Sequence, residues 1–247
     1  MRSFERSTNP FANLSFHDVE QIATEIASDG VACVPAGFSD DAMGQARDQA
    51  MSAVERAGGE YTARTGPDGL NGLILTELST HPAFAQLCRS LCVLLGFTPP
   101  ADCSTKQVLR CLAGGTGLDH AYYFHFDSFE LTAVVPIVMP QEGKTGDLIL
   151  LPNFRPRRKS YMVNMVEKFI FDRPAMQALL KRRASHSPTV RRIRLQPGNV
   201  YFFNGNRTLH ANEECDPEAM RVTLIIHYAE THGDHWVRRA RRKLRPA

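Results

Sequence analysis

The stretch His120-Ala-Tyr-Tyr-Phe-His125-Phe-Asp127-Ser-Phe-Glu-Leu131 places an imidazole and a carboxylate two residues apart in an aromatic run typical of a β-strand. Residues i and i+2 of a strand point to the same face of a sheet, so the pattern predicts that His125 and Asp127 share a face. A metal ion is a common reason for a protein to bring these two groups together. A core histidine that is hydrogen-bonded to a neighbouring acid would give the same local pattern.

A third ligand is available far downstream, in the stretch Asn204-Gly-Asn-Arg-Thr-Leu-His210-Ala-Asn212. Two histidines and one carboxylate that leave coordination positions open form the ligand set of non-haem iron oxygenases. The order of the residues supports this interpretation. His210 follows a Pro-Gly turn and an aromatic strand-like run, and Arg221 lies eleven residues beyond it.

Arg221 begins the run Arg221-Val-Thr-Leu-Ile-Ile-His-Tyr228, in which residues 221, 223, 225 and 227 are predicted to share one face. An arginine that points into a protein core is costly unless it meets an anion. A dicarboxylic cosubstrate would supply that anion through bidentate hydrogen bonds, and Thr223 would add a neutral donor. Alternatively, Arg221 lies at an exposed strand end and pairs with one of three nearby acids, Glu213, Glu214 or Glu218.

The set His125-x-Asp127, His210 and Arg221 resembles the Fe(II)- and 2-oxoglutarate-dependent dioxygenases, most closely the phytanoyl-CoA dioxygenase-like branch, over about residues 104–229. The resemblance implies a double-stranded β-helix, a cupin-like jelly roll whose metal ligands line one mouth. It implies Fe(II) held by these two histidines and Asp127, and 2-oxoglutarate bound through Arg221.

Two further residues are candidates for cosubstrate contacts. The family often has a small hydroxyl residue two positions after the distal histidine, where this chain has Asn212. Tyr123 shares the predicted inward face with His125 and Asp127, although an ordinary core aromatic would occupy the same position.

The resemblance implies that 2-oxoglutarate and O2 are consumed, that succinate and CO2 are released, and that an unactivated C–H bond is hydroxylated. Because Asp127 fills the position that a halide would need, we expect hydroxylation rather than halogenation, while desaturation and ring formation use the same ligands. The expected substrate is a small anionic metabolite, such as an amino acid or a natural-product intermediate. A cupin-like dioxygenase that does not use 2-oxoglutarate and a non-catalytic jelly-roll binding protein remain alternatives.

The rest of the sequence predicts a mainly β protein with flanking helices, organised as one domain over residues 1–236. Residues 1–103 are expected to form a helical support, and residues 104–229 a jelly-roll core with a lid-like helical insertion at 153–187. Helices are predicted at 17–28, 40–58 and 81–95, with a loop at 61–71. Strands are predicted at 31–35, 106–112, 121–129, 131–139, 148–151, 190–195, 199–203 and 221–228.

Basic residues gather at two places. The insertion and its surroundings hold cations that could attract an acidic metabolite, or that are simply solvated: Arg155, Arg157, Arg158, Lys159, Lys181, Arg182, Arg183 and Arg207. A second group, residues 237–247, carries six basic residues and no acid, so the rest of the chain is net negative although the whole carries +3. No aromatic interleaving or nucleic-acid module accompanies this tail, so we expect it to be solvated and expect no nucleic-acid partner.

The composition is that of a globular protein, with 43% hydrophobic and 22% charged residues among 247. No apolar run is long enough to span a membrane, and the N-terminal residues lack the apolar core of a signal peptide, so a cytoplasmic location without a membrane partner is expected. The six cysteines lack paired zinc-type spacing and are predicted to be buried free thiols.

Overall fold

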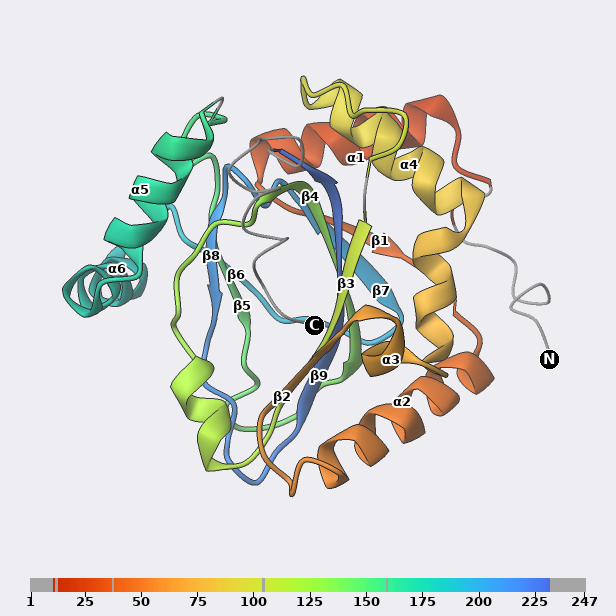
Figure 1. Ribbon diagram of the computed structural model, residues 1–247, viewed down its shortest axis with the longest axis vertical. Helices are drawn as coiled ribbons and strands as arrows, with labels where there is room; N and C mark the ends of the chain where they lie inside the picture. The colour runs from red at the N-terminus through yellow and green to blue at the C-terminus, as the bar shows by residue number, and fades with distance from the viewer. Residues whose placement is uncertain (1–10, 12, 37, 104, 159, 232–247) are drawn as a thin grey trace.

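The computed structural model describes residues 11, 13–36, 38–103, 105–158 and 160–231 (Figure 1). The strands are β1 Ala32–Pro35, β2 Thr62–Thr65, β3 Thr105–Leu112, β4 Phe129–Val138, β5 Leu148–Leu151, β6 Arg191–Ile193, β7 Asn199–Phe203, β8 Leu209–Asn212 and β9 Arg221–Glu230. The α-helices are α1 Phe16–Ser28, α2 Asp40–Glu55, α3 Gly66–Leu70, α4 Pro82–Leu94, α5 Tyr161–Phe171 and α6 Pro174–His186, and two 3-10 helices are η2 Ile74–Thr80 and η3 Gly115–His120.

Two antiparallel sheets face each other at the centre of the molecule. The larger has the strand order β1-β7-β4-β9-β3-β2, and the smaller has the order β6-β5-β8. Side chains of Val134, Tyr201 and Phe203 from the large sheet pack against Leu148 and Leu150 of the small one. This is the layered β-structure with non-consecutive neighbours that the jelly-roll prediction requires, so the predicted fold class is confirmed.

The N-terminal helices cover the outer face of the large sheet (Figure 1). Helix α1 begins at Ser15, whose hydroxyl accepts from the Asp18 amide while the Asp18 carboxylate accepts from the Ser15 amide, a complete capping box. The core beneath these helices includes Phe84 of α4 and Phe202 of β7, which are fully buried. Because this core holds the large sheet from outside, the opposite face of the sheet is available for a site.

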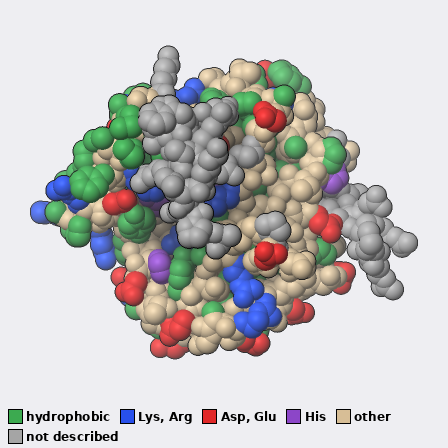
Figure 2. Space-filling model, viewed as in Figure 1, with side chains coloured by type: hydrophobic (Ala, Val, Ile, Leu, Met, Phe, Trp, Pro, Cys, Tyr) green, Lys and Arg blue, Asp and Glu red, His purple; other side chains and the backbone are tan. Residues whose placement is uncertain are grey.

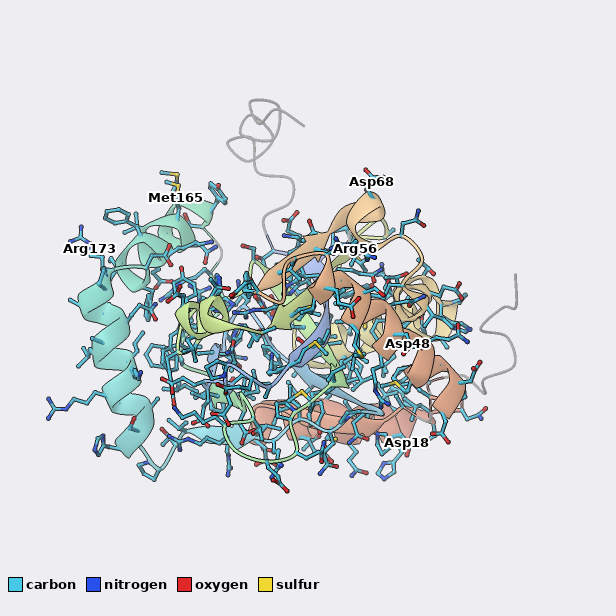
Figure 3. The ribbon with its side chains drawn as sticks, turned by 90° about the horizontal axis from the view of Figure 1, so that it is seen from below. Asp18, Asp48, Arg56, Asp68, Met165 and Arg173 are labelled. Atoms are coloured by element: carbon cyan, nitrogen blue, oxygen red, sulfur yellow. The ribbon has the colours of Figure 1, made fainter. Side chains whose placement is uncertain are left out.

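The insertion forms the two helices that the sequence predicts, broken at Asp172 and Arg173, and they lie at one side of the sheets (Figures 1 and 3). Helix α6 packs Leu180 and Ala184 onto the small sheet. Helix α5 buries none of its side chains. Its apolar residues are exposed and gather with others at the left of Figure 2: Met162, Val163, Val166, Phe169 and Ile170.

The strand predicted at 121–129 is wrong. The chain forms η3 up to His120, Tyr122 adopts a positive φ of 54°, and β4 begins only at Phe129. The side chain of Gln177 on α6 satisfies the backbone of Phe124, accepting from its amide and donating to its carbonyl, each at 2.8 Å. A side chain therefore replaces the neighbouring strand that the sequence pattern anticipated.

Other local predictions differ from the structure in smaller ways. The loop predicted at 61–71 contains β2 and α3, and the strand β8, which carries His210, was not predicted. All six cysteines are free, but Cys33 is exposed and Cys103 is half-buried, so only four of them are buried as predicted. Lys159 and the basic residues at 237–247 lie outside the described residues. Within the described ranges, no helix has the length and apolarity needed to cross a membrane.

Candidate metal centre and anion-binding cavity

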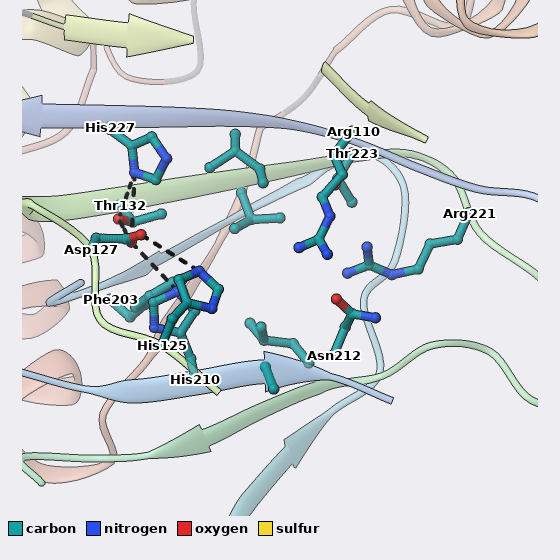
Figure 4. A pocket seen from close by; sticks show the side chains of 14 residues that line it. Arg110, His125, Asp127, Thr132, Phe203, His210, Asn212, Arg221, Thr223 and His227 are labelled. Atoms are coloured by element: carbon teal, nitrogen blue, oxygen red, sulfur yellow. Dashed lines mark hydrogen bonds and ion pairs between the residues drawn. The ribbon is translucent and has the colours of Figure 1, made fainter. Parts of the chain in front are cut away.

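A cavity of about 70 Å³ lies between the two sheets (Figure 4). One end holds three histidines and an aspartate, and the other end holds two arginines. Its wall between these ends is largely apolar. The lining residues are Arg110, His125, Asp127, Thr132, Val134, Leu148, Phe203, His210, Ala211, Asn212, Arg221, Thr223, Ile225 and His227.

His125, Asp127 and His210 form the one group of potential metal ligands found among the described residues, and their ligand atoms all lie within 4.8 Å of one another. His125 Nε2 lies 3.9 Å from Asp127 Oδ1, and His210 Nε2 lies 3.5 Å from Asp127 Oδ2. His210 comes from β8, while His125 and Asp127 precede β4. The structure therefore brings together the three predicted ligands, although the first two are not on a regular strand.

Both imidazoles are oriented by backbone carbonyls. His125 Nδ1 lies 3.0 Å from the carbonyl oxygen of Tyr123, and His210 Nδ1 lies 3.0 Å from that of Thr208. A carbonyl can only accept, so these contacts place a proton on Nδ1, and in a neutral ring Nε2 then carries the free lone pair. In both rings Nε2 is the atom that faces Asp127. Burial and the neighbouring His210 lower the pKa of His125, which keeps that ring neutral and able to bind a metal.

Asp127 is held by two residues that the sequence analysis did not assign to the site. Thr132 Oγ1 donates to Asp127 Oδ2 at 2.6 Å, and His227 Nδ1 lies 3.6 Å from the same oxygen (Figure 4). Burial alone would raise the pKa of Asp127, but the surrounding histidines, with His227 foremost, and the Thr132 hydroxyl lower it to about 2. The carboxylate is thus ionised, and its Oδ1 is the less engaged oxygen.

The opposite end of the cavity holds buried donors without partners among the described residues. Arg221 is 3% exposed, and its Nε has no hydrogen-bond partner among the described residues. Thr223 Oγ1 is also buried without a partner. Burial lowers the pKa of Arg221 to about 10, with the like charge of Arg110 acting in the same direction. The alternative interpretation placed Arg221 at an exposed strand end, paired with nearby glutamates. The structure does not show this arrangement among the described residues.

Of the two remaining predicted site residues, Asn212 lines the cavity and Tyr123 does not. Asn212 is buried and faces Arg221 across the cavity, while its amide donates to the Glu213 carbonyl at 2.9 Å (Figure 4). Tyr123 is 42% exposed and does not line the cavity. Its hydroxyl donates to Asp172 Oδ1 at 2.5 Å, so the expectation of an inward-facing Tyr123 is wrong.

Residues missed at the sequence level reach the cavity for different reasons. His227 lies on the same alternating face of β9 as Arg221, so the period of that strand contained the signal. Thr132 and Arg110 carry no such local signal. They are opposite His227 and Thr223 in the antiparallel register of β9 with its neighbours.

At the end of the cavity with the candidate metal ligands, His125 is the most exposed of the three. The side chain of His125 is 31% exposed, whereas those of Asp127 and His210 are 8% and 7% exposed. A second, smaller cavity of about 20 Å³ lies between His125 and α5. It is lined by His125, Phe126, Ser128, Arg155, Asn164, Lys168, Phe171 and Asp172.

Several basic residues of the insertion are already paired within the protein. Arg155 donates to Glu167 at 2.5 Å, Arg158 also pairs with Glu167, and Arg157 pairs with the fully buried Glu130. Because these charges are compensated, they anchor the insertion to the core rather than attracting a ligand to the mouth.

No family model and no curated protein sequence matches the chain. Solved structures do. EctD from S. alaskensis with bound Fe is 13% identical, with a TM-score of 0.60 over 90% of this chain and 78% of that one. The epimerase SnoN, solved with Fe3+, alpha ketoglutarate and nogalamycin RO, is 16% identical, with a TM-score of 0.54 over 87% and 85%.

The non-heme alpha ketoglutarate dependent carbocyclase SnoK from nogalamycin biosynthesis is 16% identical, with a TM-score of 0.55 over 90% of this chain and 86% of that chain. At these identities the likeness concerns the fold. The chain therefore has the fold of the iron- and 2-oxoglutarate-dependent oxygenases. The phytanoyl-CoA dioxygenase-like branch stays a prediction.

Proposed function

We propose that the chain is an Fe(II)- and 2-oxoglutarate-dependent oxygenase that hydroxylates an unactivated C–H bond of a small anionic metabolite. The observation that carries this proposal is one cavity with a His-Asp-His ligand group at one end and, at the other, the buried Arg221, whose Nε has no hydrogen-bond partner among the described residues. The two ends match the two anionic ends of a 2-oxo dicarboxylate. The fold likeness to enzymes solved with iron or alpha ketoglutarate supports the same proposal.

The donor set fits Fe(II). Two imidazole Nε2 atoms and one ionised carboxylate oxygen converge, and a ligand group of this composition leaves positions for a cosubstrate and O2. Hydrogen bonds to the other atoms of these side chains fix their orientation, as is usual around bound metals. His125, Asp127 and His210 would therefore hold the iron.

Arg221 and Thr223 would bind the distal carboxylate of 2-oxoglutarate. Each has a buried donor without a partner, and a carboxylate accepts from several donors at once. Fe(II) with 2-oxoglutarate and O2 supplies the oxidising chemistry, with release of succinate and CO2. The chain positions both cosubstrate ends, and the apolar side chains of Val134, Leu148 and Ile225 exclude water between them.

The substrate would approach from the exposed side of His125, through the smaller cavity under α5. Of the cations there, Arg155 is fully engaged, whereas Lys168 forms no ion pair within the described part of the chain. An exposed lysine beside a cavity wall of Phe126 and Phe171 suits a small molecule with an anionic group and an apolar body. A coenzyme A ester or a protein side chain suits this small cavity less well.

The proposal is tested by anaerobic titration of the purified protein with Fe(II) and 2-oxoglutarate, followed through the visible charge-transfer band of the chelate. We expect a band in the wild type that is lost in Asp127→Ala and needs far more 2-oxoglutarate in Arg221→Ala. His186→Ala is the matched control, because His186 is exposed on α6 and belongs neither to the ligand group nor to the lining of the two cavities.

The same titration separates the alternatives. Bound iron without a band, together with turnover that survives in Arg221→Ala, would indicate a cupin-like dioxygenase that does not use 2-oxoglutarate. Absence of iron binding, with no rise in melting temperature on adding Fe(II) and 2-oxoglutarate, would indicate a non-catalytic binding protein, because any ligand of the folded state must stabilise it.

A further inference from the structure

Arg110 lies at the anion-binding end of the cavity but belongs to neither the metal group nor the predicted cosubstrate contacts. It stands on β3 directly opposite Thr223 of β9. Antiparallel partners project to the same face of a sheet, so Arg110 enters the cavity beside Thr223 and diagonally from Arg221. Figure 4 shows the guanidinium groups of Arg110 and Arg221 turned toward each other.

The charges at this end do not balance within the protein. Neither Arg110 nor Arg221 forms an ion pair with an acid of the described residues, and Nε of each is buried without a hydrogen-bond partner. Two guanidinium groups that face each other, with Arg221 buried and Arg110 half-buried, repel each other, and each has a buried Nε–H without an acceptor among the described residues. An anion between them removes both costs at once.

Arg110 is also held in place by groups that do not neutralise it. Its Nη2 donates to the His120 carbonyl at 3.3 Å, and its guanidinium lies 6.0 Å from the Tyr61 ring centroid. Tyr61 in turn stacks on the His120 ring, with the centroids 3.5 Å apart. Contacts from η3 and from the residue before β2 thus keep this arginine directed at the cavity while leaving its charge available.

We propose that Arg110 is a second cosubstrate-binding residue, which shares with Arg221 the carboxylate that lies farthest from the metal ligands. This inference rests on the proposed function. A carboxylate has about four lone-pair sites, so it accepts from two guanidinium groups and from Thr223 together. A 2-oxo acid without a distal carboxylate would leave both arginines unpaired, so this end of the cavity makes the site selective for dicarboxylates.

The test measures cosubstrate affinity rather than turnover. Fe(II)-loaded protein is titrated anaerobically with 2-oxoglutarate and, separately, with pyruvate, which has the 2-oxo acid but no distal carboxylate. We expect Arg110→Met to bind 2-oxoglutarate about 10- to 100-fold more weakly, in the range for lost hydrogen bonds to a charged group, while pyruvate affinity stays the same. Arg64→Met is the matched control, because Arg64 lies on the neighbouring strand β2 and does not line the cavity.

Arg110→Lys covers the case in which Arg110→Met does not fold. Lysine keeps the charge but not the forked donors of arginine. We therefore expect Arg110→Lys to bind 2-oxoglutarate with an affinity between those of the wild type and Arg110→Met. If Arg110→Met does not fold, the expected affinity of Arg110→Lys is several-fold below that of the wild type. A merely structural Arg110 would weaken 2-oxoglutarate and pyruvate equally.

Wild-type affinity for 2-oxoglutarate in Arg110→Met, or in Arg110→Lys where only that variant folds, would overturn the inference and leave the proposed function intact. Equal weakening of the two 2-oxo acids would do the same. Failure of the wild type itself to bind 2-oxoglutarate would overturn both.

Discussion

His125 and His210 are joined through their backbones: the amide of His125 donates to the carbonyl of His210 at 3.0 Å, and the amide of His210 donates to the carbonyl of His125 at 3.1 Å. Residues that exchange both hydrogen bonds in this way project to the same face, and the two ring centroids lie only 4.3 Å apart. Main-chain pairing therefore sets the spacing of the two ligands, and the imidazoles themselves are not needed for it.

His210→Ala is accordingly expected to fold and to lose its metal. The backbone bridge remains, so the free energy of unfolding of the metal-free protein should fall by no more than about 2 kcal/mol, within the usual range for a single substitution. Fe(II) affinity should fall by at least about 100-fold, beyond the usual effect of losing an outer-shell partner. Anaerobic competition with a chromogenic chelator measures this, with His186→Ala as control. Unchanged iron stoichiometry in His210→Ala would remove this residue from the ligand group.

Gly205 is expected to be essential for the metal centre although it offers no ligand. A Cβ at this position would lie 2.5 Å from both Asp127 Oδ2 and Thr132 Oγ1, which are buried and hydrogen-bonded to each other. Gly205→Ala should therefore displace the carboxylate, lowering Fe(II) affinity about 10- to 100-fold and stability by about 1–3 kcal/mol.

The control for this prediction is Gly44→Ala, since Gly44 lies in α2 and a Cβ added there would meet nothing within 4 Å outside its own helix backbone and chain neighbours. It should leave iron binding unchanged and stabilise the protein by about 0.5–1 kcal/mol, as expected for alanine in a helix. Chelator competition and chemical denaturation on the three proteins provide both numbers. Wild-type iron affinity in Gly205→Ala would show that the carboxylate tolerates displacement.

The strand period was sufficient to predict one wall of the site but not the other. Residues of β9 at every second position from Arg221 to His227 line the cavity, because side-chain alternation is a local property of the strand. Arg110 and Thr132 enter through pairing with β9, which depends on chain segments distant in sequence. No local pattern contains that register.

The segment around His125 shows the opposite case, in which a good local pattern gives the wrong element. The alternation at 121–129 suggested a strand, but Gln177 binds the Phe124 backbone and Tyr122 turns into the left-handed region. The structure still brings the two predicted ligands together with His210, because the backbone bridge to His210 keeps His125 locally extended. The prediction for Tyr123 was wrong because the chain turns at Tyr122, and the Tyr123 side chain points outward to the end of α5.

Tyr123→Phe distinguishes a cosubstrate contact from an attachment of α5. The Tyr123 hydroxyl donates to Asp172 at the end of that helix, and α5 itself buries no side chain. We expect iron and 2-oxoglutarate affinities within about twofold of the wild type, and faster proteolysis within residues 161–186, because local opening costs less once this contact is lost.

Asp172→Ala, which removes the acceptor, should have the same effect on proteolysis, and the double variant should add little to either single one, because the two residues share one contact. Fully additive effects would show that the hydrogen bond does not attach the helix. A tenfold loss of 2-oxoglutarate affinity in Tyr123→Phe would instead restore Tyr123 as a cosubstrate contact.

The ion pairs of Glu167 are expected to make the attachment of α5 weaker at acid pH. Burial by itself would raise its pKa, but hydrogen bonds from Arg158 and Arg155 lower it below the ordinary value. A carboxylate with a lowered folded-state pKa stabilises the protein fully above its unfolded-state pKa of about 4.3, and this contribution is lost as the pH falls through the folded-state value.

Glu167→Gln should therefore cost about 1–2 kcal/mol at pH 7, as for hydrogen bonds to a charged group, and progressively less below about pH 4. Denaturant titrations of both proteins from pH 7 to pH 3 measure this difference, with the exposed Glu77→Gln as control. A difference that stays constant down to pH 3 would show that the ionised carboxylate is not what anchors the helix.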